Sequence, residues 1–205
     1  MQTAPILRNV SSELRTERLY LRCPREGDGA AVHEAVVESL QQLRAWPASL
    51  PWALAEPSVE ASEIFCRESA AAFLKRTSFV FLVFDHADTF VASTSLHGIN
   101  WKVPKFETGF WCRATRQGNG YTTEAISRLI RYAISDLGAN RVDALTDERN
   151  VASRAVCEAS GMQLEGVLRN EDITPSGVLC NTCVYAVASS FFTLAGRTGF
   201  DNGTR

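Results

Sequence analysis

The chain has 205 residues, of which 45 % are hydrophobic and 21 % charged, which is the balance of one globular domain with a single core. Its 21 basic and 23 acidic side chains give a formal net charge of -2 without a basic stripe, so no nucleic-acid partner is expected. No stretch is apolar over the length that a membrane span requires, so no membrane partner is expected either.

The first part of the chain predicts a short strand, two helices and a loop between them. Alternating residues predict a strand over 18–23, and apolar residues at helical spacing predict helices over 29–46 and 59–75. The segment WPASLPWALAEP between the helices is rich in Pro and Trp. We expect a loop that packs its own aromatics, Trp46 and Trp52, and that forms a candidate wall of a substrate site.

The rest of the chain predicts three strands in a meander, then a helix, a strand, a short helix and two closing strands. The segment TTEAISRLIRYAISDLG places its apolar residues on one stripe and is the clearest helix, with Gly138 able to end it in a left-handed conformation. The short helix is predicted over 151–160, where Gly161 stops it. The strands are predicted over 79–84, 90–96, 106–113, 141–145, 162–169 and 179–188.

A strand, helix, strand passage within this order predicts a parallel strand pair beside antiparallel strands. The expected fold class is therefore α/β (α+β), with a mixed, mostly antiparallel sheet of about seven strands flanked by about four helices. We expect a single domain over residues 1–190. Residues 191–205 have no hydrophobic period and are expected to form a loosely held tail.

Six cysteines are scattered along the chain, and the N-terminal segment MQTAPILRNVSSELR lacks the apolar run of a signal peptide. A reducing, cytoplasmic location is therefore expected. Cys180 and Cys183 have the spacing of a metal or redox pair, but residues three apart in a strand point to opposite faces and no second pair is present. No metal is expected.

The segment GFWCRATRQGNGYTTEA carries the most information about function. Gly118 and Gly120 allow backbone amides to approach an anion closely, and the helix that follows adds unpaired N–H groups and its positive dipole end. Arg116 adds a positive charge nearby. A simple turn is the alternative that loop statistics alone favour, but the position between a strand and a helix is typical of a phosphate-binding loop.

Three segments in this order, TERLYLRCPREGD, FETGFWC with RQGNGYTTEAI, and ERNVASRAVCEASGMQLEGVLR, resemble GNAT acetyltransferases of the RimJ/RimL-like branch, which acetylate ribosomal proteins. The resemblance extends over residues 16–188. It implies the GNAT fold with two splayed parallel strands, acetyl-CoA as acyl donor, and direct attack by a primary amine in a ternary complex. The implied acceptor is a ribosomal or other protein N-terminus, or a small amine such as a polyamine or aminoglycoside, and a homodimer is compatible with it.

The resemblance also assigns the residues that hold the donor. The pantetheine arm is expected between strands 106–113 and 141–145, where a main-chain N–H near Cys112 or Arg113 polarises the thioester oxygen. Thr115 stands where the superfamily usually has Arg or Gln. The residues expected to bind the pyrophosphate, mostly through backbone N–H groups, are Gln117, Gly118, Asn119, Gly120 and Tyr121.

Asn150 and Ser153 lie three apart at the start of the short helix and share a face. In the resembling enzymes this Asn contacts pantetheine and this Ser gives a proton to the departing thiolate. The alternatives are that Asn150 only caps the helix and that Ser153 is helix surface. Cys157 stands where many superfamily members have Tyr, and we expect it to pack as a small apolar residue.

A general base must take the proton of the attacking amine. Glu107 is the first candidate because strand alternation places it with residues 109 and 111 on one face, and a surface carboxylate is the alternative. Asp172 is the rival, because related enzymes carry an acidic residue on this segment. Asn181 stands where the family usually has an Asp on the final strand. Tyr185 keeps the family's aromatic position nearby, and a tyrosine there is more often a core residue than a catalytic one.

Three further residues are candidates for acceptor binding. His97 binds substrate or acts as a base, although a structural His is the more frequent role. Trp101 and Trp46 are candidate walls of an acceptor groove, and packing is equally expected of them. The departures from the family pattern at Thr115 and Cys157 also keep open a second class of function, a non-catalytic acyl-CoA-binding or sensory module.

Overall fold

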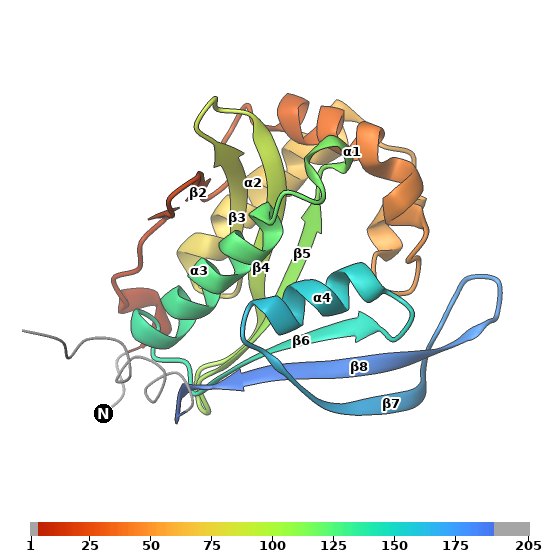
Figure 1. The fold of residues 1–205 in the computed structure, drawn as a ribbon. Helices are drawn as coiled ribbons and strands as arrows, with labels where there is room; N and C mark the ends of the chain where they lie inside the picture. The colour runs from red at the N-terminus through yellow and green to blue at the C-terminus, as the bar shows by residue number, and fades with distance from the viewer. Residues whose placement is uncertain (1–3, 191–205) are drawn as a thin grey trace, which may run out of the picture.

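A mixed sheet of eight strands runs through the structure, with helices on both of its faces (Figure 1). The computed structural model describes residues 4–190. The strand order is β1-β2-β3-β4-β5-β6-β8-β7, and every neighbouring pair is antiparallel except β5 and β6. The strands are β1 (Glu13–Arg15), β2 (Leu19–Arg22), β3 (Phe79–Asp85), β4 (Phe90–Asn100), β5 (Lys105–Cys112), β6 (Arg141–Asp147), β7 (Gln163–Ile173) and β8 (Leu179–Ala188), and the helices are α1 (Gly29–Arg44), α2 (Val59–Lys75), α3 (Tyr121–Ser135) and α4 (Val151–Ala159).

The central strand β3 is buried on both faces, which its uninterrupted run FVFLVF makes favourable. Phe79 and Phe81 point toward α3, whereas Leu82 and Phe84 pack with the apolar residues of α1 and α2. Burial of such side chains contributes about 1.5–3 kcal/mol each. The two helix layers are therefore held on opposite faces of one sheet.

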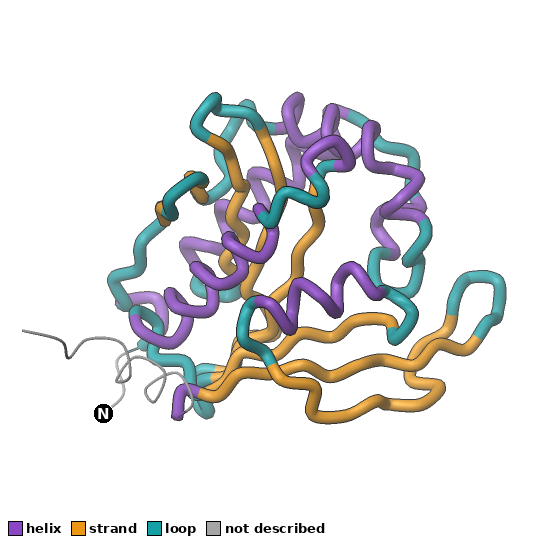
Figure 2. Tube along the Cα trace, in the orientation of Figure 1, coloured by secondary structure: helices purple, strands orange, loops and turns teal. Residues whose placement is uncertain are grey.

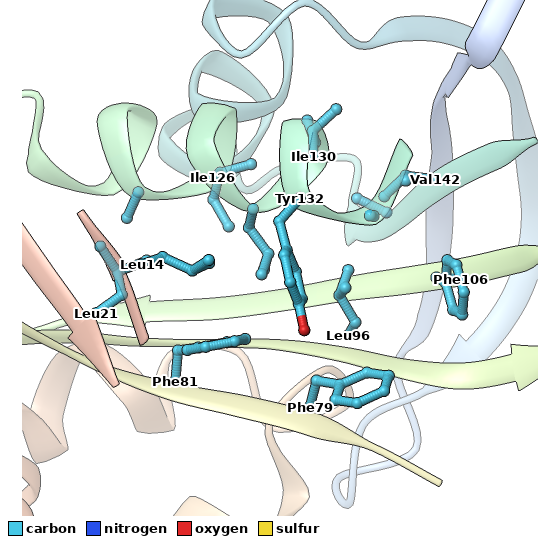
Figure 3. Close-up of a cluster of buried hydrophobic side chains, with 14 of the residues drawn as sticks. Leu14, Leu21, Phe79, Phe81, Leu96, Phe106, Ile126, Ile130, Tyr132 and Val142 are labelled. Carbon is cyan, nitrogen blue, oxygen red and sulfur yellow. The ribbon is translucent and has the colours of Figure 1, made fainter. Parts of the chain in front are cut away.

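The apolar stripe of α3 covers the first of these faces (Figure 3). Tyr132 lies at its centre, fully buried, with its ring edge-to-face against Phe81 at 5.7 Å and Phe79 at 6.5 Å. Its hydroxyl donates to the Ser11 carbonyl at 3.0 Å. A buried hydroxyl with a hydrogen-bond partner does not cost stability, so this packing holds α3 on the sheet.

The parallel strands β5 and β6 separate after a short paired stretch (Figure 2). Pairing covers only residues 105–107 of β5 and 141–143 of β6. Beyond it, β5 stays with its antiparallel partner β4 as far as Cys112, and β6 stays with β8 as far as Asp147. Because sheet twist rotates the two antiparallel groups apart, the backbone edges of both strands are left unpaired, as expected for the splayed pair.

Most predicted elements are confirmed, with four corrections, the first being that β7 continues to Ile173 beyond its predicted end at residue 169. The sheet has eight strands, because β1 has three residues with one buried side chain and is too short to show a period. A bulge lets β4 continue to Asn100, so the predicted turn shrinks to residues 101–104. The first helix ends at Arg44, two residues early. The expected tail, residues 191–205, lies outside the described residues. None of the helices within residues 4–190 has the length and apolar character needed to cross a bilayer.

Candidate active site

The loop between β5 and α3 keeps its backbone open to solvent. Gly118 and Gly120 adopt φ values of +75° and +74°, the left-handed region that glycine enters without strain. A Cβ on Gly118 would meet no atom within 4 Å, and one on Gly120 only Arg18 Nη2 at 3.5 Å. No side chain caps the first turn of α3. Its N–H groups are therefore free to bind an anion.

The first helix holds this loop in place from the side. The Glu38 carboxylate accepts hydrogen bonds from Thr115 N at 2.9 Å, Thr115 Oγ1 at 2.7 Å and Arg113 Nε at 2.7 Å. Ser39 Oγ accepts another from Ala114 N at 2.9 Å. Thr115, which departs from the usual family residue, is thus an anchor between α1 and the loop, and no sequence pattern indicated Glu38.

The environment of Glu38 predicts that the free energy of unfolding depends on pH. Burial raises its pKa, but the hydrogen bonds from Thr115 and Arg113 outweigh burial and hold the pKa at about 2, below the ordinary 4.5. Because the folded pKa is depressed, the contribution is full above the unfolded pKa and is lost as pH falls toward 2. We expect Glu38→Gln to lower the free energy of unfolding by about 1 kcal/mol at neutral pH, since the carboxylate is partly solvent-screened.

Urea unfolding at about pH 7 and about pH 3 measures this difference, which should shrink at the lower pH. Glu34→Gln is the matched control. Glu34 also pairs with Arg113, but its side chain is 70 % exposed and it does not contact Thr115. An equal and pH-independent loss in both variants would contradict the anchoring role of Glu38.

Arg18 is a second residue that the sequence did not indicate. Its guanidinium donates to Glu124 Oε2 at 2.6 Å and to the Asn119 carbonyl at 3.0 Å, and it lies over the Tyr121 ring at 4.8 Å. These contacts join residues about a hundred positions apart, so no local signal could have shown them. They hold the ion pair of Arg18 and Glu124 beside the loop and occupy the Asn119 carbonyl with a hydrogen bond.

A groove of about 500 Å³ extends from this loop along β5 to α4. It brings together most of the expected donor-binding residues with Arg116, and Phe110 and Trp111 line it in addition. The expected residues in its lining are Trp46, Cys112, Gln117, Gly118, Gly120, Tyr121, Asn150 and Ser153. Trp46, a candidate wall of an acceptor groove, therefore lines the same space as the Gly-containing loop. Asn119 belongs to the same loop but is not part of the lining.

The splayed edge of β5 offers main-chain donors to this groove. Arg113 N donates to the Val91 carbonyl at 2.9 Å, so this amide is not available for a thioester. Along a strand, the backbone N–H groups of successive residues point alternately to its two edges. The amides of Cys112 and Phe110 therefore face the unpaired edge of β5. The Arg113 side chain binds Glu34 and Glu38 instead of lining the groove. Of the two expected donors, only Cys112 N faces the gap.

Helix α4 presents Asn150 and Ser153 to the same groove. Asn150 Oδ1 accepts a hydrogen bond from Ser153 N at 3.0 Å, so Asn150 caps the helix and also lines the groove. The Ser153 hydroxyl has no partner among the described residues. Cys157 is fully buried, and burial raises the pKa of its thiol to about 12, so it packs as an apolar residue.

A second pocket of about 560 Å³ lies between α1, α2 and the sheet. It shares Leu50, Phe110 and Trp111 with the groove, so the two spaces adjoin. The Trp-containing loop forms one wall, with the Trp52 ring 6.1 Å from the Trp111 ring. His97 lines this pocket from β4.

The remaining candidate residues lie outside both pockets. Glu107 is the direct cross-strand neighbour of His97 and shares its sheet face. Asp172 lies on the hairpin of β7 and β8, which projects beyond α4 (Figure 1), and its carboxylate accepts from Ile173 N at 2.8 Å. Trp101 packs against the core, donating to the Arg76 carbonyl at 3.0 Å. Packing, the alternative weighed for Trp101, is what the structure shows.

Free thiols and a buried tyrosine complete the set of candidate residues. The six cysteines are free thiols, and Cys183 is buried in the core. Tyr185 is also a core residue, with its hydroxyl donating to Glu158 at 2.7 Å. Within the part of the chain that the structure describes, no group of three or more His, Cys, Asp or Glu side chains could hold a metal ion.

Comparisons with known proteins agree with this geometry. The model of the acetyltransferase (GNAT) domain family matches residues 18–163. The uncharacterized N-acetyltransferase YoaA of Bacillus subtilis (strain 168) is 30 % identical over 97 residues, which are 47 % of this chain and 54 % of that protein. The chain thus spans about half the length of the curated relatives it matches.

Two solved structures share the fold. RimL, a ribosomal L7/L12 alpha-N-protein acetyltransferase in complex with coenzyme A, gives a TM-score of 0.77 at 20 % identity, over 84 % of this chain and 95 % of that one. The microcin C7 self-immunity acetyltransferase MccE, in complex with acetyl-CoA and AMP, gives 0.75 at 20 % identity, over 84 % and 93 %. With a family match over well more than half of its residues, the chain belongs to the GNAT acetyltransferase family.

Proposed function

We propose that this protein transfers the acetyl group of acetyl-CoA to a primary amine by direct attack in a ternary complex. The observation that carries the proposal is an anion-binding loop whose free amides open onto a groove, which in turn adjoins a second pocket. The groove fits a long donor that is anchored by its diphosphate at one end. The second pocket then receives the acceptor.

We assign a group of the protein to each step of the reaction. The backbone of residues 117–121 holds the diphosphate, with Gly118 and Gly120 allowing the close approach. The amide of Cys112 stabilises the oxyanion that forms as the amine nitrogen bonds to the thioester carbon. The C–S bond then breaks, and Ser153 gives its hydroxyl proton to the departing thiolate and regains a proton from solvent, while Asn150 contacts the pantetheine arm.

The proton of the amine leaves toward β4 and β5. His97 is the candidate within the acceptor pocket, Glu107 is its neighbour on the same face, and Asp172 remains the distant rival. We expect His97→Gln to lower kcat/KM by about 100-fold, Glu107→Gln by about 10-fold, and Asp172→Asn by less than about 2-fold. The dependence of kcat/KM on pH measures which variant loses the basic group. A large loss in Asp172→Asn alone would overturn this ranking.

The acceptor class follows from the family and from RimL, whose name specifies an N-terminal amine of a ribosomal protein. A protein N-terminus, ribosomal or other, is therefore the first acceptor class and a small amine the second. Thiol release from acetyl-CoA in the presence of both amine classes tests the proposal, together with acetyl-CoA binding by calorimetry. Binding without transfer to any amine would favour the non-catalytic acyl-CoA-binding module. The absence of both acetyl-CoA binding and thiol release would refute both functions.

A further inference from the structure

The acceptor pocket is walled mainly by aliphatic and aromatic side chains. Helix α1 contributes Val36 and Leu40, the connecting loop contributes Trp52, and Phe65 comes from α2. The shared residues Phe110 and Trp111 close the side toward the groove. An apolar group placed here leaves water and gains contacts with several rings, which favours ligands with a large hydrophobic body.

Charge is nearly absent from the same lining. Its ionisable residues are Glu56 and His97. The Glu56 side chain is 90 % exposed and pairs with Arg44 at 3.2 Å, so it lies at the rim and is already neutralised. A polyamine or an aminoglycoside carries several positive charges and needs several carboxylates. The lining of this pocket does not supply them.

Three polar side chains of the pocket lie on one strand, and Ser49, Ser58 and Ser62 line its other walls. Ser93, Ser95 and His97 alternate along β4 and face the pocket together. A Cβ on Gly109 would come within 3.0 Å of His97 Nε2 and 3.2 Å of Ser95 Oγ, so the missing side chain keeps this polar strip open. Gly109 precedes Phe110, which lines both spaces. The polar strip therefore lies where an amine meets the donor, and the apolar body points toward the helices.

We propose that the acceptor is a primary amine with a bulky apolar group, aromatic or long aliphatic, within a few bonds of the nitrogen. An N-terminal phenylalanine or leucine and a small arylalkylamine share this chemistry. The proposal rests on the acetyl transfer proposed above and narrows its substrate class. Hydrophobic pockets discriminate by about 10-fold or more for each added apolar group, so the preference is measurable.

The experiment compares matched acceptors on the full chain with acetyl-CoA. The amides of phenylalanine, leucine, alanine and serine differ only in the side chain, and we expect kcat/KM to be about 10- to 100-fold higher for the first two. Tetrapeptides that begin with phenylalanine or serine, against phenethylamine and ethanolamine, distinguish a protein N-terminus from a small amine. Equal or better use of the serine and alanine compounds would overturn the proposal.

Two variants on α2 test the pocket itself. Ala61 lines the pocket, so Ala61→Trp should fill it and lower the ratio of phenylalaninamide to alaninamide kcat/KM by about 10-fold. Ala71 is exposed on the same helix outside both pockets, so Ala71→Trp should leave the ratio unchanged. An equal ratio in both variants would overturn the assignment of this pocket.

Calorimetric titration separates the two levels of the proposal. The protein could bind acetyl-CoA but neither bind nor acetylate phenethylamine and phenylalaninamide. That result would overturn the substrate class and leave the donor site standing. Absence of acetyl-CoA binding would overturn the proposed function and the substrate class together. Transfer at a higher rate to the apolar acceptors supports both.

Discussion

Gly120→Glu should abolish acetyl-CoA binding, raising the Kd by about 100-fold or more. Gly120 is the left-handed N-cap residue of α3, and the space beside it is open except for Arg18. A glutamate there adds backbone strain, bulk and a negative charge where the diphosphate is expected to bind. Isothermal titration of acetyl-CoA against the purified variant measures the effect.

Two further variants separate the contributions to this loss. Gly120→Ala carries the backbone strain without the charge, so we expect it to bind more tightly than Gly120→Glu. Gly177 also has a positive φ, of +84°, with open space around it, and lies in the β7–β8 turn outside both pockets. Gly177→Glu should therefore leave the Kd unchanged. Wild-type affinity in Gly120→Glu would refute the placement of the donor.

Ser153→Ala should lower kcat by about 100-fold and leave the Kd for acetyl-CoA within about 2-fold of wild type. The Ser153 hydroxyl faces the groove without a protein partner, whereas its backbone N–H is held by Asn150. The substitution removes the hydroxyl and leaves the capping hydrogen bond intact. The loss is thus expected in the transition state, where the thiolate needs a proton.

A serine on the neighbouring helix provides the control for this experiment. Ser127 lies in α3, outside both pockets, and Ser127→Ala should leave kcat unchanged. Stopped-flow measurement of the first turnover shows whether the chemical step itself has slowed in Ser153→Ala. An unaltered kcat in that variant would mean that Ser153 serves only as helix surface.

Local patterns predicted much of the fold because their signals lie within one element. The apolar stripe of α3, the run of β3 and the turn residues around them indicated helix, strand and loop without tertiary information. The same holds for the anion-binding loop, since Gly118, Gly120 and the helix start are contiguous in the chain. The three-residue strand β1 was missed because it is too short to carry a period.

Contacts between distant segments could not be predicted in this way. Glu38 supports the loop from α1 across 77 residues, and Arg18 reaches Asn119 across 101. Asp172 and Trp101 matched family or composition arguments, yet one lies on the outer hairpin and the other packs on the core. Side-chain position relative to a pocket depends on how elements pack, which spacing along one element does not show.

The sequence by itself determined the order of the elements, the free amides at the start of α3 and the pairing of Asn150 with Ser153, because backbone conformation and helical spacing are local properties. Only the tertiary structure decided that Cys112 N and not Arg113 N faces the gap between β5 and β6, and that an apolar pocket with His97 adjoins the groove. These features arise where segments far apart in the chain pack on one twisted sheet, and the free energy of that packing is a property of the whole fold.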